Sequence, residues 1–265
     1  MEPALTPFSK TVSSMQETGA GFSVEPEENW YQGRTLFGGL VGAFAVEAAQ
    51  RSVRDLPPLL SAQFSLIGPA SGKLEIRPQV LRTGRSTTFV GIDVMSGPDV
   101  AMRAVLTFGR ARPSRHALNL LDVRHTTSPA DGVPLFEAPR APRNTVNFEG
   151  RLVGGCTPFS GGREAVLEMW LRHRDVEPVS PAVSLIALAD ATPPAVFSLF
   201  TAPAPISTAT WSVDFCATEF DPMGWFYART SSGFVQDGYS LQTTVMSNPE
   251  GHPVLVSRQL VALYD

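Results

Sequence analysis

The chain has 265 residues, of which 43% are hydrophobic and 17% are charged. This composition is typical of a soluble globular protein and excludes an intrinsically disordered one. The formal net charge is −4 and the pI is about 5.6, so neither nucleic acid nor an anionic membrane surface is expected as the main partner.

The cysteines and histidines are too few and too scattered to predict a disulfide framework or a metal site. We therefore expect no metal and no redox cofactor. His173 is interpreted as an exposed strand residue and Cys216 as a thiol in the core. The amino terminus lacks the features of a signal peptide, and no apolar run reaches the length of a membrane span, so a cytoplasmic protein is expected.

The first half of the chain predicts one long helix followed by an antiparallel sheet. Before the helix, one strand is expected around residues 8–12 or 21–24. Residues 36–53 are rich in alanine and other apolar side chains, as in a buried helix. Gly38 and Gly39 lie at its start, where they favour close backbone approach, to a ligand or to a neighbouring strand.

Four strands should follow this helix, because turn residues separate stretches with partial alternation of apolar and polar side chains. They are predicted at 60–67, 73–83, 86–96 and 100–110.

Proline, arginine and serine then become frequent, which is typical of a linker across the surface. We assign residues 113–146 to this linker, with at most a short helix at 117–121. The amino-terminal module then covers 1–112 and the carboxy-terminal module 147–265.

The second half repeats the order of helix and then four strands. A strand pair is predicted at 147–154 and 163–172, and a helix begins after Ser180, with Pro181 at its first position. The later strands are predicted at 207–215, 224–230, 234–247 and 252–263.

Matching residues support an internal repeat. The stretch 88–96 corresponds to 240–247, and both end in Val-Met-Ser. Residues 100–105 correspond to 255–260, which places Ala104 opposite Gln259. Aligning the two helices on Val41 and Val183 places Ala48 opposite Asp190.

Asp190 conflicts with its local pattern, because it stands at the end of an otherwise apolar helix, just before Pro193 and Pro194. Aspartate is rarely buried without a partner and is disfavoured near a helix carboxyl terminus. Such conflicts tend to mark functional sites. Glu47, on the first helix, is the rival carboxylate, and we interpret it as a solvated or paired helix charge.

These motifs together resemble the acyl-CoA thioesterase II family. The resemblance rests on Arg34-Thr-Leu-Phe-Gly-Gly-Leu-Val-Gly, on the Arg82-Thr-Gly-Arg-Ser86 turn and on the last strand, Pro253-Val-Leu-Val-Ser-Arg-Gln-Leu. It covers residues 30–265 and implies an α+β double hotdog fold, with two tandem modules that each wrap an antiparallel sheet around a long helix.

The family's catalytic set, carried over by position, falls on Asp190, Thr208 and Gln259. Thr210 stands where the family often has an Asp, so Thr210 stays open as an alternative to Thr208. Alternation along the strand predicts that both threonines share a face with Ser212. Substrate contacts are expected at Phe37, Gly38 and Gly39.

The resemblance implies hydrolysis of fatty acyl-CoA to free fatty acid and coenzyme A. Asp190 would act either as a general base towards water or as a nucleophile through an anhydride. The alternative is a non-catalytic acyl-CoA or lipid-binding hotdog protein. A dehydratase on the same fold would need an Asp–His pair and ranks last. We also expect association into a homo-oligomer, a dimer or larger.

Overall fold

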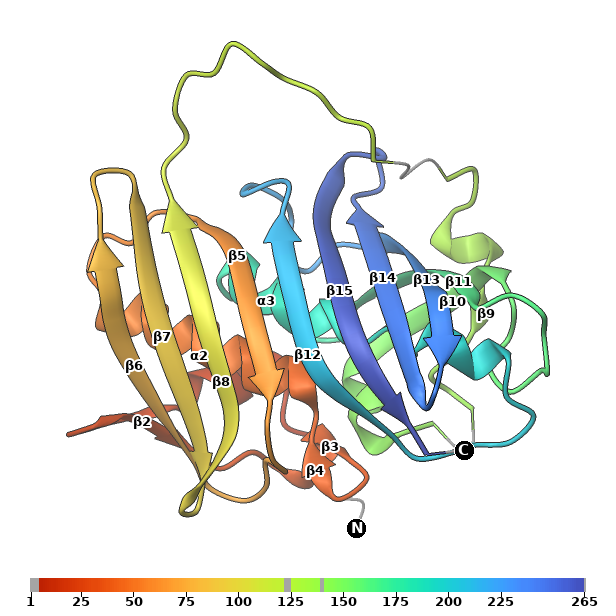
Figure 1. Ribbon diagram of the computed structural model, residues 1–265, viewed down its shortest axis with the longest axis horizontal. Helices are drawn as coiled ribbons and strands as arrows, with labels where there is room; N and C mark the ends of the chain where they lie inside the picture. The colour runs from red at the N-terminus through yellow and green to blue at the C-terminus, as the bar shows by residue number, and fades with distance from the viewer. Residues whose placement is uncertain (1–4, 122–124, 139–140, 265) are drawn as a thin grey trace.

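The computed structural model describes residues 5–121, 125–138 and 141–264. Within them the chain forms one antiparallel 13-stranded sheet, with two helices against one of its faces (Figure 1). In order across the sheet the strands are β1 (Gln16–Thr18), β2 (Gly21–Val24), β6 (Leu74–Thr83), β7 (Thr87–Ser96), β8 (Asp99–Gly109), β5 (Leu59–Leu66), β12 (Ile206–Phe215), β15 (Pro253–Leu263), β14 (Tyr239–Ser247), β13 (Phe226–Gln236), β11 (Val166–His173), β10 (Phe148–Gly155) and β9 (Val133–Pro134).

The helical segments are α1 (Phe8–Ser13), α2 (Gly38–Ser52) and α3 (Pro181–Ala189), with 3-10 turns η1 (Glu28–Trp30), η2 (Pro129–Asp131), η3 (Arg143–Asn147) and η4 (Ala195–Ser198). A small hairpin, β3 (Tyr31–Gln32) with β4 (Thr35–Leu36), leads into α2. The strand order β2-β6-β7-β8-β5 is mirrored by β11-β13-β14-β15-β12. This is the α+β double hotdog that the sequence predicts.

Most of the elements lie where the sequence places them. The four strands of the first half are confirmed to within one residue at each end. Of the two alternatives near the amino terminus, residues 21–24 form the strand, while residues 8–12 belong to α1. Residues 117–121, where at most a short helix was expected, are irregular.

One predicted strand boundary in the second half was also wrong. The stretch predicted as a strand at 234–247 is divided by a tight turn at Asp237-Gly238, where φ is 52° and 76°. Phe234 therefore belongs to β13, and β14 begins at Tyr239. Asp-Gly is a strong hairpin signal, because both central residues of such a turn need positive φ.

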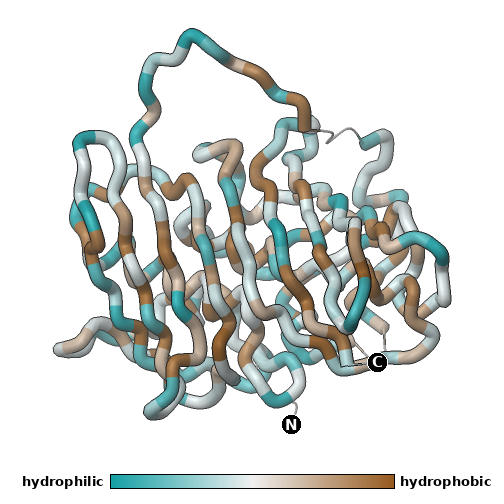
Figure 2. Tube along the Cα trace, in the orientation of Figure 1, coloured by the Kyte–Doolittle hydropathy of each residue, from teal (hydrophilic) through white to brown (hydrophobic). Residues whose placement is uncertain are grey.

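The two modules meet where β5 pairs with β12 at the centre of the sheet. Trp211 lies opposite Phe64 in this pairing, and their ring centroids are 4.9 Å apart, with an interplanar angle of 26°. Both side chains are buried on the helix side of the sheet. Apolar residues recur along the long strands, as expected when one sheet face covers a core (Figure 2).

Strand register supports the prediction that Ala104 and Gln259 are equivalent positions of the internal repeat. Gln259 lies opposite Trp211 across β12 and β15, as Ala104 lies opposite Phe64 across β5 and β8. The two residues therefore occupy equivalent places around the sheet's central junction.

The correspondence between 88–96 and 240–247 needs a shift of one residue. Gln242 lies opposite Gln259, and Ile92 lies opposite Ala104, so Ile92 is the counterpart of Gln242. Matching the two Val-Met-Ser sequences places Gly91 there instead. The reason is that β-bulges interrupt the two strand pairs at different positions.

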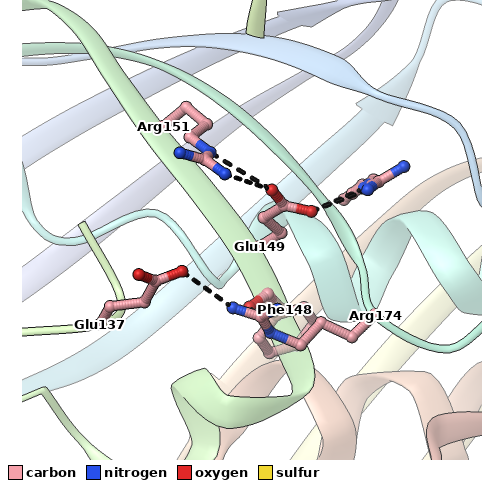
Figure 3. A network of polar contacts seen from close by, with 6 residues as sticks. Glu137, Phe148, Glu149, Arg151 and Arg174 are labelled. Atoms are coloured by element: carbon pink, nitrogen blue, oxygen red, sulfur yellow. Dashed lines mark hydrogen bonds and ion pairs between the residues drawn. The ribbon is translucent and has the colours of Figure 1, made fainter. Parts of the chain in front are cut away.

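Ion pairs join the strands at the far edge of the second module (Figure 3). Glu149 accepts from Arg151 and Arg172, each at 2.8 Å, and Arg174 pairs with Glu137 at 3.5 Å. Arg174 and Glu137 are exposed, and an exposed pair of this kind contributes roughly 0–1 kcal/mol. The pair of Glu149 with Arg172 joins β10 to β11.

We expect Trp211→Ala to destabilise the fold by about 3–5 kcal/mol, because it leaves a cavity at the junction of the modules. Chemical denaturation measures this loss. Trp211→Phe is the matched control and should cost less stability. The indole N–H of Trp211 is buried without a partner, so no hydrogen bond is lost, and Phe64 already fills the equivalent position of the first module. Equal losses for both variants would show that the junction does not depend on this packing.

Candidate active site

Asp190 lies where the end of α3 meets the start of α2. It is the carboxyl-terminal cap residue of α3, which ends at Ala189. A Cβ built on Gly38 would lie 3.0 Å from its Oδ2 atom, and one on Gly39 would lie 2.7 Å from the carbonyl oxygen of Ala187. The glycine pair therefore allows the backbone of α2 to approach both the carboxylate and the last turn of α3.

Two donors hold the carboxylate of Asp190. Gln259 Nε2 donates to its Oδ1 atom at 2.7 Å, and the backbone N–H of Gly39 donates to the same group. Gly39 stands in the first turn of α2, whose positive dipole end favours a negative charge. The start of α2 thus offsets the unfavourable position of Asp190 at the end of α3.

Burial raises the pKa of Asp190 to about 7, although the hydrogen bonds from Gln259 and Gly39 each lower it. The carboxyl group is enclosed by protein, while part of the residue stays accessible to solvent. A carboxyl group with this pKa exchanges its proton near neutral pH, as a general base must.

Thr208 and Thr210 do not share a strand face, contrary to the prediction from alternation. The register of β12 against β15 shifts between Thr208 and Thr210, so Ala209 forms a bulge. Thr208 lies opposite Val261, on the same face as Gln259, whereas Thr210 is exposed on the outer face. The bulge therefore brings Thr208 to the side of the sheet that carries Gln259.

The hydroxyl group of Thr208 makes no hydrogen bond with any other residue that the structure describes. Thr208 is only partly buried. Its hydroxyl remains able to donate to or accept from a molecule outside the chain. Gln259, by contrast, is joined directly to Asp190.

The first module lacks this polar set at its equivalent positions. Ala48 is the sequence counterpart of Asp190, Ala104 replaces Gln259, and Ala62 lies where register places Thr208. All three alanines are buried. The fold can therefore be built without these polar groups.

The rival carboxylate is engaged elsewhere. Glu47 accepts from Arg51 Nε at 2.7 Å, four residues along α2. This confirms the interpretation of Glu47 as a paired helix charge.

The structure places the three predicted substrate contacts at the beginning of α2. Phe37 is buried and packs edge-on against Phe148, with ring centroids 5.6 Å apart. Its side chain therefore belongs to the core. Gly38 and Gly39 instead present their backbone next to Asp190.

Sequence reasoning missed Gln242, which is 2% exposed on β14. Its Nε2 atom donates to Gln259 Oε1 at 2.7 Å, and its Oε1 atom accepts from the N–H of Ala195 at 2.8 Å. The signal in the sequence is that the second module has a glutamine where the first module has Ile92. The alignment that was off by one residue concealed it.

Two interpretations of single residues were wrong. His173 is 2% exposed and stacks on Phe8 at 4.5 Å, and burial lowers its pKa to about 4. Phe8 comes from a distant helix, which local sequence could not show. Cys216, interpreted as a core thiol, is exposed.

Among the described residues, no group of three or more histidine, cysteine, aspartate or glutamate side chains is placed to hold a metal ion. In the same part of the chain, no helix has the length and apolar character needed to cross a membrane.

Comparison with known families assigns the chain to one of them. The family model for the acyl-CoA thioesterase N-terminal domain matches residues 26–109, and the model for the acyl-CoA thioesterase C-terminal domain matches residues 124–263. The chain belongs to the acyl-CoA thioesterase family. A search of curated proteins found no match.

Solved structures of similar fold cover nearly the whole chain. A hot dog fold protein of unknown function from Alicyclobacillus acidocaldarius is 23% identical, with a TM-score of 0.87 over 98% of this chain and 99% of its own. An acyl-CoA thioesterase II from Mycobacterium marinum is 16% identical, with a TM-score of 0.73 over 96% and 97%. A tesB protein from Mycobacterium avium subs. paratuberculosis is 18% identical, with a TM-score of 0.77 over 97% and 98%. At these identities the likeness shows a shared fold.

The raised pKa of Asp190 predicts a pH-dependent loss of stability. Its folded pKa of about 7 exceeds its ordinary value of 3.8, so its contribution is present below about pH 4 and is lost as pH rises through about 7. Relative to Asp190→Asn, the wild type should lose roughly 2–4 kcal/mol across this window, allowing for partial exposure. Thermal unfolding of both proteins from about pH 4 to 8 measures the difference, and parallel curves would contradict it.

Proposed function

We propose that this acyl-CoA thioesterase family member hydrolyses fatty acyl-CoA with a water molecule activated by Asp190, Thr208 and Gln259. The products are a free fatty acid and coenzyme A. The observation that carries the proposal is the carboxylate of Asp190, which is enclosed, has a pKa of about 7 and is held by Gln259 Nε2 at 2.7 Å.

In the proposed reaction, the oxygen of water forms a bond to the thioester carbonyl carbon, and its proton moves to Asp190. Negative charge develops on the carbonyl oxygen as this bond forms. The intermediate then collapses, the carbon–sulfur bond breaks, and coenzyme A leaves as a thiolate that takes up the proton held by Asp190, which restores the carboxylate. The reaction thus consumes one water and one thioester and yields one fatty acid and one coenzyme A.

Each of the other groups has a role that its position supports. Gln259 holds the carboxylate, and the hydroxyl of Thr208 orients the attacking water, because hydroxyls both donate and accept. We assign oxyanion stabilisation to the N–H groups and dipole at the start of α2, around Gly38. Arg82, Arg85 and Arg110 are exposed, and we assign them no role in the reaction.

Asp190→Asn should reduce thiol release from acyl-CoA by about 10²–10⁴-fold, because an amide cannot accept the proton of water. In the wild type, kcat/KM should rise with pH and level off above about pH 7, where Asp190 is deprotonated. A panel of acyl-CoA substrates of different chain length, assayed for free thiol, measures both effects.

Glu47→Gln serves as the control and should retain activity, since Glu47 is paired with Arg51. Full activity of Asp190→Asn would move the site to Glu47. Absence of turnover on every substrate of the panel would instead favour the non-catalytic acyl-CoA-binding protein.

The bulge in β12 predicts a contrast between two neighbouring threonines. Thr208→Val should lower kcat by roughly 10–100-fold, because it removes the hydroxyl that orients water. Thr210→Val lies on the outer face and should change kcat by less than about twofold. Steady-state kinetics of the two variants decides the matter, and the reverse ranking would assign the hydroxyl role to Thr210.

A further inference from the structure

We infer that Gln242 is a positioning residue, which fixes the amide of Gln259 so that its nitrogen always faces Asp190. This inference rests on the proposed function of Asp190. Gln242 lies opposite Gln259 on the neighbouring strand and is 2% exposed, so it does not itself reach a substrate. Its effect must pass through Gln259.

Three consecutive hydrogen bonds connect a backbone group to the carboxylate. The N–H of Ala195 donates to Gln242 Oε1 at 2.8 Å, Gln242 Nε2 donates to Gln259 Oε1 at 2.7 Å, and Gln259 Nε2 donates to Asp190 Oδ1 at 2.7 Å. We call this series the amide relay. Ala195 is the first residue of η4, directly after Pro193 and Pro194.

The direction of the amide relay is set at its backbone end. A glutamine amide can present either oxygen or nitrogen, but a backbone N–H can only donate. Ala195 therefore holds the oxygen of Gln242 towards itself, which turns the nitrogen of Gln242 towards Gln259. Gln259 must then accept with its oxygen and donate with its nitrogen to Asp190.

This fixed direction acts on the protonation of Asp190. A donor that cannot turn into an acceptor stabilises the carboxylate more than the protonated carboxyl group, because hydrogen bonds to a charged acceptor are stronger. The amide relay therefore lowers the pKa of Asp190, against the effect of burial, which raises it. Without it, the amide of Gln259 could rotate so that its oxygen accepts a hydrogen bond from protonated Asp190, which would favour the protonated form.

The first module shows that the fold does not require an amide at this place. Ile92, the counterpart of Gln242, lies opposite Ala104, the counterpart of Gln259. Along the same face, Val90 and Val94 correspond to Ser240 and Thr244. Thr244 is also buried, but its hydroxyl is paired with that of Thr230 at 2.9 Å, outside the amide relay.

Gln242→Met keeps the approximate shape of the side chain and breaks the relay. We expect the rising limb of the kcat/KM profile to move up by about one pH unit, so that activity falls roughly tenfold at about pH 6 and changes little at about pH 9. The KM for acyl-CoA should stay the same. An unshifted limb would overturn the inference.

Thr244→Val is the matched control, because it also removes one partner of a buried hydrogen bond on the same face of β14. It should lower stability without moving the limb. A shift equal to that of Gln242→Met would show that the limb reports general loosening of the sheet and would overturn the inference.

A measurement on the wild type keeps the inference testable if Gln242→Met does not fold. In NMR spectra, the side-chain amide of Gln242 and the N–H of Ala195 should shift with a midpoint at the pKa of Asp190, about 7. Signals that stay constant through this range would overturn the relay. If these signals titrate but no acyl-CoA is hydrolysed, the proposed function fails and the relay stands.

Discussion

The enclosed carboxylate of Asp190 is the constraint on which the site depends. Its charge is unfavourable at the end of α3, and burial raises its pKa to about 7. The start of α2 and the last strand, β15, compensate by supplying the N–H of Gly39 and the amide of Gln259. A side chain at Gly38 would occupy the space next to the carboxylate. Both modules are therefore needed to hold one residue.

The two modules share a backbone plan but differ in what they enclose. In the first module, Ala48, Ala104 and Ile92 fill the equivalent places with apolar groups, which need no partners. In the second, Gln242 and Gln259 bring amides that must be hydrogen-bonded where they are buried, and they are joined to each other. The difference between the two modules thus separates the groups that build the sheet from those to which we assign chemistry.

The sequence was sufficient for the two long helices, for most of the strands and for the conflict at Asp190, because these depend on local pattern. The face of Thr208 was not predictable, since a bulge at Ala209 arises from how β12 pairs with β15. The role of Gln242 was missed for a related reason. Bulges at different positions in the two modules displaced the sequence alignment of the repeats by one residue. The burial of His173 depends on Phe8, which is remote in the sequence.

Direct titration of the Asp190 side-chain carboxyl by carbon-13 NMR tests the central claim most simply. It needs no substrate, no variant beyond Asp190→Asn for assignment, and no assumption about the reaction. Enclosure with only two donors predicts a midpoint of about 7. A midpoint near the ordinary value of 3.8 would show a solvated or fully compensated carboxylate and would contradict its role as a base at neutral pH.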